Sequence, residues 1–177
     1  MKLLVGLGNP GPIHSKNLHN VGFILLDYIA QDFFPNLKFS ENKKTKSLEL
    51  KNTKTILAKP LTFMNNSGEA IALIKSFYKI PLENILIIHD DIDQPLGAFK
   101  IVNKGGSGGH KGVESIFNTL KTKEILRLKV GVAPDFYNPS IHKADDFVLK
   151  NLTKLDIKTL KELYLNELKP FISSFIK

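Results

Sequence analysis

The chain has 177 residues and a formal net charge of +8, from 25 lysine and arginine residues against 17 aspartate and glutamate residues. Apolar residues make up 42% of it, which is enough for the core of a domain this long. The absence of cysteine excludes disulfides, thiolate nucleophiles and cysteine-ligated metal centres, and fits a reducing compartment. No run approaches the roughly 18 apolar residues of a membrane span and the N-terminus lacks a signal-peptide core, so we expect a cytoplasmic protein.

The basic residues are concentrated in two blocks of the sequence. Residues 1–60 and residues 100–143 each carry a net charge of +5, whereas residues 61–99 between them carry −3. Arg127 is the only arginine, so the positive field comes mainly from lysine point charges, which suit phosphate groups better than bidentate recognition of bases. We therefore predict a face that binds a nucleic-acid backbone, with ordinary solvated lysine surface as the alternative.

Strands alternate with helices along the chain. Apolar runs predict strands at 2–7, 84–89, 97–103 and 127–132, and residues 47–59 predict a hairpin. Helical spacing of apolar residues predicts helices over 21–34, 66–78 and 110–120. These elements predict a single α/β domain over residues 1–177, with a central mixed β-sheet flanked by α-helices.

The second and the last of the predicted helices carry local signals. Asn66-Ser67-Gly68-Glu69 resembles a capping box in which the Asn66 side chain caps the helix. The last 25 residues predict a C-terminal amphipathic helix that Pro170 kinks or restarts. Its inner face is expected to carry Leu155, Leu160, Leu163 and Leu168.

The segment GLGNPG at residues 6–11 matches the G-x-G-x-x-G pattern directly after a predicted strand. A dinucleotide-binding loop needs a helix that begins at the glycines, but here Pro12 follows and helical spacing starts only near residue 21. The better interpretation is a tight loop that presents Asn9, His14 and His19 at the carboxyl end of the strand, where open α/β sheets bind ligands.

The segment GGSGG at residues 105–109 matches the G-x-S-x-G nucleophile elbow, and Ser107, Asp135 and His142 follow the hydrolase order. Four glycines around the serine are more typical of a flexible loop than of a strained elbow. The alternative is a glycine-rich loop whose amides, with Lys104 and Lys111 beside them, hold a phosphate or a peptide backbone.

The segment HDDID at residues 89–93 ends the most apolar predicted strand. Its carboxylates could form a metal site, a solvated turn, or an orienting partner for a histidine general base.

The segment KPLTFMNNSG at residues 59–68 places Met64 beside Asn65 just before a helix. A carboxamide can donate to a carbonyl and accept from an amide at the same time, so Asn65 is a candidate for recognising peptide backbone.

Together these motifs resemble bacterial-type peptidyl-tRNA hydrolases over nearly the whole chain. The matching segments are GLGNPG…HNVGF (6–23), KPLTFMNNSG (59–68), HDDIDQPLG (89–97), GGSGGHKGVESI (105–116) and RLKVGV (127–132). The resemblance implies a metal-independent, cofactor-free and monomeric esterase that cleaves the bond between a peptide and the terminal ribose of tRNA.

On that resemblance His19 matches the catalytic base and Asp90 its carboxylate partner, while Asn9 and Asn65 match the asparagines that hold substrate and water. An imidazole with the usual pKa of about 6.5 can take a proton from water at neutral pH, so water can attack the ester directly.

Further binding residues are expected around this centre. His14 stands where the family usually has tyrosine, and Lys111 where it has asparagine; we count both, with Met64, as substrate-binding candidates. Lys104, Lys129 and Arg127 are the candidates for tRNA phosphate contacts. The alternatives are a non-catalytic RNA-binding module on the same fold and a serine hydrolase that uses Ser107.

Overall fold

All seven strands belong to one mixed sheet. The computed structural model describes the backbone of all 177 residues and every side chain except that of Asp145. The strand order is β2-β3-β4-β1-β5-β7-β6. The strands are β1 (Lys2–Gly6), β2 (Ser40–Asn42), β3 (Ser47–Lys51), β4 (Thr55–Pro60), β5 (Ile85–Pro95), β6 (Phe99–Val102) and β7 (Leu126–Ala133). This arrangement confirms the predicted α/β class with a central mixed sheet.

The four central strands are parallel. β1 pairs in parallel with both β4 and β5, and β5 pairs in parallel with β7. The predicted hairpin is confirmed as the antiparallel pair β3–β4, and β2 and β6 are antiparallel strands at the two edges. Because parallel strands end at the same edge of a sheet, the loops after β1, β4 and β7 and the last part of β5 meet there.

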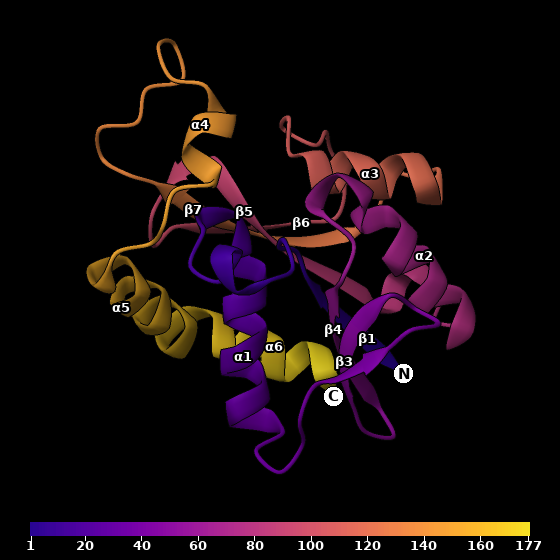
Figure 1. Cartoon of the computed structure of the whole chain (residues 1–177). Coiled ribbons are helices and arrows are strands. Elements are labelled where there is room, and N and C mark those ends of the chain that lie inside the picture. The colour runs from indigo at the N-terminus through magenta and orange to yellow at the C-terminus, as the bar shows by residue number, and fades with distance from the viewer.

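Helices cover both faces of the sheet (Figure 1). They are α1 (Val21–Phe33), α2 (Ser67–Phe77), α3 (Lys111–Leu120), α4 (Ala144–Val148), α5 (Lys154–Leu163) and α6 (Lys169–Ile176). Successive residues of β1 point to opposite faces: Leu4 packs in the core beneath α1, α5 and α6, whereas Leu3 and Val5 pack in the core beneath α2 and α3. Burial on both faces explains why the central strands are continuous apolar runs.

Two local predictions about the helices are wrong. Residues Met64–Asn66 form a 3₁₀ turn that runs into α2, and the Asn66 side chain makes no capping hydrogen bond; the Ser67 hydroxyl instead donates to the Met64 carbonyl at 2.8 Å. Leu155 is 69% exposed, because it lies on the outer side of α5, whose inner face begins with the partly buried Ile157 and the buried Leu160.

The rest of the C-terminal prediction is confirmed. Leu160, Leu163 and Leu168 are buried, and a short π-helical stretch at Tyr164–Leu168 joins α5 to α6. Pro170 lies in the first turn of α6, where the missing amide hydrogen costs nothing, so the helix restarts there.

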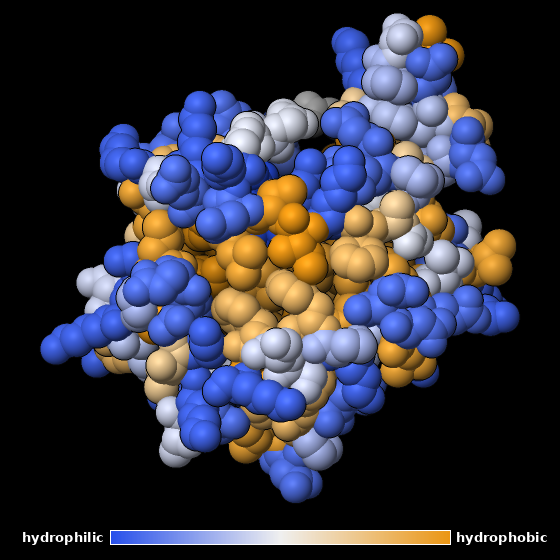
Figure 2. Space-filling view, turned by 180° about the vertical axis from the view of Figure 1, so that it is seen from behind, coloured by the Kyte–Doolittle hydropathy of each residue, from blue (hydrophilic) through white to orange (hydrophobic). Residues whose placement is uncertain are grey.

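The rear face of the molecule has a hydrophobic middle bordered by hydrophilic residues (Figure 2).

Edge strand β6 is only four residues long, and it exposes Lys100 beside Ile101, which is 40% exposed. A short edge strand with a charged residue discourages pairing with another chain. None of the described helices combines the length and the hydrophobicity that a membrane span requires.

Candidate active site

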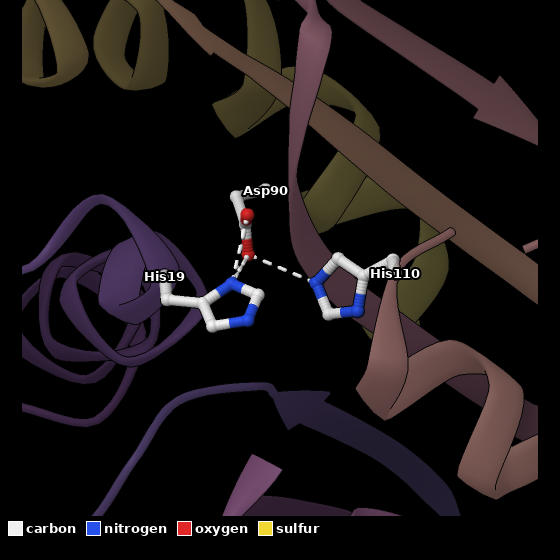
Figure 3. Close-up of side chains that lie close together, drawn as sticks. All are labelled: His19, Asp90 and His110. Carbon is white, nitrogen blue, oxygen red and sulfur yellow. Dashed lines mark hydrogen bonds and ion pairs between the residues drawn. The ribbon is translucent and has the colours of Figure 1, made fainter. Parts of the chain in front are cut away.

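Three side chains from distant parts of the sequence meet at the carboxyl edge of the sheet (Figure 3). His19 comes from a 3₁₀ turn (Leu18–Asn20) just before α1, Asp90 from β5, and His110 from the residue before α3. Asp90 lies between the two histidine rings, whose centroids are 4.8 Å apart. The carboxylate is inside β5 and not after its end, because the strand continues through HDDID to Pro95.

His19 is held by Asp90 through one ring nitrogen only. Its Nδ1 lies 2.9 Å from both carboxylate oxygens. A carboxylate accepts, so Nδ1 carries the proton and Nε2 of the neutral ring keeps its lone pair. That Nε2 makes no hydrogen bond to any described residue, and the ring lines two cavities. The arrangement leaves one basic nitrogen open toward these cavities.

His110 contacts the same carboxylate through its other nitrogen. Its Nε2 is 2.9 Å from Asp90 Oδ1, while its Nδ1 accepts from the amides of Gly112 and Val113 at 3.2 and 3.3 Å. The ring is thus the N-cap of α3, and its Nδ1 carries no proton. His110 therefore supplies a second donor to Asp90 and has no free nitrogen for proton transfer.

Asp90 is buried but remains a carboxylate. Burial alone raises its pKa, but His110 and His19 more than offset this and hold the pKa of the carboxyl below its ordinary value. Neighbouring His89 behaves differently: its Nδ1 donates to the Asp90 backbone carbonyl at 2.7 Å, and its Nε2 is buried without a partner among the described residues. Burial lowers the pKa of His89 to about 3, so this ring is neutral.

The His19, Asp90 and His110 cluster has the spacing of a metal site, since one ligand atom from each lies within 4.8 Å of the others. A metal ion on His110 Nε2 would displace its proton, yet Nδ1 cannot take that proton while it accepts the two helix amides. The donor set therefore favours the hydrogen-bonded arrangement over a metal centre.

Asn9 and Asn20 fix the loop after β1. The Asn20 side chain bonds both backbone groups of Asn9, accepting from its amide at 3.0 Å and donating to its carbonyl at 2.9 Å. The Asn9 carboxamide oxygen in turn accepts from the Met64 amide at 2.8 Å. The side-chain NH₂ of Asn9 has no partner among the described residues and remains available to a ligand.

A cavity of about 400 Å³ opens beside His19. It brings together the sequence candidates Asn9, Met64, Asn65 and Lys111, together with Phe63, Val148 and Leu149. Phe63 and Leu149 are 59% and 54% exposed, so apolar groups are available at its surface. His14 is absent from this lining; its Nδ1 contacts Asn17 Oδ1 at 2.9 Å, and Asn17 ties the turn to the 149–151 segment.

A second, smaller cavity of about 70 Å³ lies on the side of His110. Lys129 lines it, 22% exposed, with its Nζ 2.9 Å from Asp91 Oδ2. Burial raises the pKa of the Asp91 carboxyl, but hydrogen bonds from Lys129 and Gln94 outweigh it and leave the pKa below normal. Asp91 thus serves as the ionised partner of Lys129.

The remaining basic candidates differ in exposure. Lys104 and Lys111 are exposed. Arg127 is only 1% exposed, and its guanidinium donates to two backbone carbonyls of the glycine-rich segment. Arg127 thus does not lie on the surface expected of a phosphate contact, because the side chain extends beneath α3.

The serine-hydrolase arrangement is not assembled. The Ser107 hydroxyl accepts from the Gly109 amide at 3.3 Å, while His142 Nδ1 accepts from the Asn138 amide at 3.0 Å. Among the described residues, no histidine ring hydrogen-bonds the Ser107 hydroxyl.

Sequence reasoning missed two residues of this centre, His110 and Asn20. His110 follows four glycines and precedes a helix, which is a possible N-cap position, but its contact with Asp90 depends on the tertiary fold. Asn20 follows His19 directly, and its pairing with Asn9 becomes visible only when the loop is closed.

Comparison with known proteins identifies the family. The model of the family described as peptidyl-tRNA hydrolase matches residues 3–177. A peptidyl-tRNA hydrolase of Mycoplasmopsis pulmonis is 38% identical over 176 residues, covering 99% of this chain and 90% of that protein. One from a Sulfurihydrogenibium species is 41% identical over 154 residues, covering 87% of this chain and 80% of that protein.

The fold agrees with a solved structure. The crystal structure of peptidyl-tRNA hydrolase from Acinetobacter baumannii matches with a TM-score of 0.77 and 25% identity, covering 99% of this chain and 94% of that one. The α/β fold and the sequence matches define a hydrolase. The chain belongs to the peptidyl-tRNA hydrolase family.

Proposed function

We propose that His19 is the general base when this chain hydrolyses peptidyl-tRNA, and that Asp90 orients it. One observation carries this proposal: Asp90 binds His19 through Nδ1 at 2.9 Å and leaves Nε2 open toward the cavities. The geometry matches the role of an orienting carboxylate, which fixes the tautomer and stabilises the imidazolium as it forms. The activity itself follows from family membership.

The proposed reaction proceeds by direct attack of water. His19 Nε2 removes a proton from water as the water oxygen bonds to the ester carbonyl carbon. The tetrahedral intermediate then collapses, the bond to the ribose oxygen breaks, and the imidazolium returns its proton to that oxygen. The products are a peptide carboxylic acid and tRNA with a free hydroxyl. These steps use no cofactor and form no covalent intermediate with the protein.

We place the peptide in the cavity that contains Asn9 and Asn65. The NH₂ of Asn9 can donate to a peptide carbonyl, and Asn65, exposed at the same cavity, can donate and accept. Phe63 and Met64 supply apolar contacts that do not depend on one peptide sequence. Lys111 lines both cavities and would bring positive charge to the junction of peptide and tRNA.

We propose Lys104 and Lys129 as phosphate contacts for the tRNA. Lys129 lies at the cavity beside Asp90, and Lys104 is exposed on the loop before α3. Loss of one true phosphate contact should reduce the slope of log affinity against log salt by about one. A variant such as Lys104→Gln with an unchanged slope would remove that lysine from the interface.

We also expect a monomer acting where ribosomes produce the substrate, in the cytoplasm. The residues of the site all come from one chain, so no second copy is needed to complete it.

The test of the catalytic assignment is tRNA release from an N-acylaminoacyl-tRNA by the wild type and by His19→Ala. Loss of a general base should lower kcat by about 10² to 10⁴. His142→Ala is the matched control, because its ring contacts Tyr137 and Phe147 outside this cluster and its loss should leave kcat unchanged.

The two alternatives give different results in the same assay. If His19→Ala released tRNA as fast as an active wild type, the assignment of His19 as the general base would be wrong. Salt-dependent tRNA binding without turnover by the wild type would indicate the non-catalytic RNA-binding module. Loss of activity in Ser107→Ala and His142→Ala would indicate the serine hydrolase.

A further inference from the structure

The single arginine of the chain occupies a special position. Arg127 is one residue into β7 and is 1% exposed, although it carries a permanent charge. Its neighbour Leu128 belongs to the core beneath α1, so Arg127 points to the opposite face, toward α3. The centre of its guanidinium lies 5.1 Å from the ring centroid of Phe117 in α3. A buried arginine in a chain whose other basic residues are all lysines calls for an explanation in terms of the guanidinium group.

Two nitrogens of the guanidinium bind two successive carbonyls. Nη1 donates to the Gly106 carbonyl and Nη2 to the Gly105 carbonyl, each at 3.2 Å. A planar guanidinium presents its donors in a fixed fork and stacks on an aromatic ring. A lysine ammonium is a point charge on a flexible stem and cannot reproduce both contacts with the same geometry. The position therefore requires arginine for its shape as well as its charge.

These carbonyls belong to the glycine-rich loop, residues 103–110, which joins β6 to α3. Gly105, Gly108 and Gly109 have φ angles of 121°, 62° and 76°, values that favour glycine. A loop so rich in glycine is intrinsically mobile unless contacts hold it. Arg127 holds one end, and His110 holds the other through Asp90 and the first amides of α3. The middle of the loop lines the cavity that also contains His19.

We propose that Arg127 is a positioning residue, which holds the glycine-rich loop against the reaction centre and acts on catalysis through His110 and the cavity beside His19. The inference rests on the proposed roles of His19 and Asp90. Arg127 thus binds the loop within the protein, whereas the sequence predicts that it contacts tRNA phosphates.

The experiment compares Arg127→Lys and Arg127→Gln with the wild type. One variant keeps the charge and the other loses it, but both lose the two-carbonyl fork. We expect kcat to fall by about tenfold or more in both, because small displacements of positioned groups are costly. The KM for N-acylaminoacyl-tRNA and its salt dependence should stay within about twofold. Amide hydrogen exchange of Gly109 and His110, whose amides donate to Ser107, should become at least about tenfold faster, while exchange in β1 stays slow.

Ile116→Val is the control for general loosening. Ile116 is buried on α3 in the same core as Phe117, but its apolar side chain cannot donate to the loop carbonyls that Arg127 binds. Its loss of a methyl group should lower the midpoint of thermal unfolding and leave kcat and loop exchange unchanged.

Several results would overturn the proposal. Wild-type kcat and loop exchange in Arg127→Lys would show that charge alone suffices. A higher KM with a reduced salt slope and unchanged kcat would restore Arg127 as a phosphate contact. If Arg127→Gln fails to fold, Arg127→Lys and the exchange measurement still decide. If instead His19→Ala keeps full activity, the catalytic assignment fails. Amide exchange in Arg127→Lys still tests separately whether Arg127 holds the glycine-rich loop.

Discussion

His19 and His110 flank the same carboxylate but are held from opposite sides. His19 gives Asp90 its Nδ1 and comes from a turn fixed by the Asn9–Asn20 pair. His110 gives Asp90 its Nε2, and the amides at the start of α3 occupy its Nδ1. Because both nitrogens of His110 are engaged, only His19 keeps a lone pair for proton transfer. The two residues are of the same type, and their roles differ because backbone amides bind the second ring nitrogen of His110 but not that of His19.

Asp90→Asn should cause the largest loss of activity, because both histidine rings bind this carboxylate. An asparagine replaces one carboxylate oxygen by an NH₂ group. Because His19 Nδ1 lies 2.9 Å from both oxygens of Asp90, this NH₂ faces the His19 ring in either orientation. Because an NH₂ group donates, the His19 ring then accepts through an unprotonated Nδ1. Its proton moves to Nε2, which loses the lone pair that a general base needs. We expect kcat to fall by about 10³ to 10⁴, as for other orienting carboxylates. Steady-state tRNA release measures it.

Asp93→Asn is the matched control for that change. Asp93 is exposed on the same strand, and its substitution removes the same charge without contacting either ring. Equal activity losses in the two variants would contradict the special role of Asp90 and point to a general effect of charge on this strand.

A smaller effect is expected at His110, where two roles can be separated. His110→Ala removes both the donor to Asp90 and the N-cap of α3, and should cost about 1 kcal/mol of stability. His110→Asn restores a good capping residue and should recover most of that stability. Both variants should lower kcat by about tenfold, because one hydrogen bond to a charged group is lost. Thermal unfolding and kcat measured together decide this, and full activity in His110→Ala would contradict the second-donor role.

The smallest effect on activity, but a clear one on stability, belongs to His89. Its pKa is about 3 in the folded protein, below the ordinary value of about 6.5, so the unfolded chain binds the extra proton first. The stability present above pH 6.5 is therefore lost as the pH falls toward 3, by about 1.4 kcal/mol for each pH unit.

His89→Asn keeps a donor for the Asp90 carbonyl and removes this titration. Denaturant unfolding between pH 6.5 and 4 should show a shallower pH dependence in the variant than in the wild type. Parallel curves would show that His89 does not carry the acid sensitivity.

Much of the fold could be predicted because its signals are local. Apolar runs predict the central strands, since these are buried on both faces, and residues 47–59 predict the hairpin. The Asn66 cap could not be predicted correctly, because a 3₁₀ turn enters α2 without a break. The sequence predicts Leu155 on the inner face, because the spacing of apolar residues alone does not tell which side of α5 reaches the core.

The residues of the candidate site that lie in sequence motifs could be predicted, whereas those placed by tertiary packing could not. His19 and Asp90 stand in recognisable segments, and their contact at 2.9 Å is what the interpretation of a base and its partner required. The sequence predicts a surface position for Arg127, because a lone arginine in a basic block resembles a phosphate ligand. Its burial depends on α3 closing over the sheet, and local sequence does not encode that contact.

The different roles of His19 and His110 can be read from ¹⁵N NMR of the five histidine rings in the wild-type protein near neutral pH. The two ring nitrogens of a neutral imidazole have different shifts according to which one carries the proton. We predict that His19 is protonated at Nδ1 and His110 at Nε2. His19 protonated at Nε2, or His110 protonated at Nδ1, would contradict it.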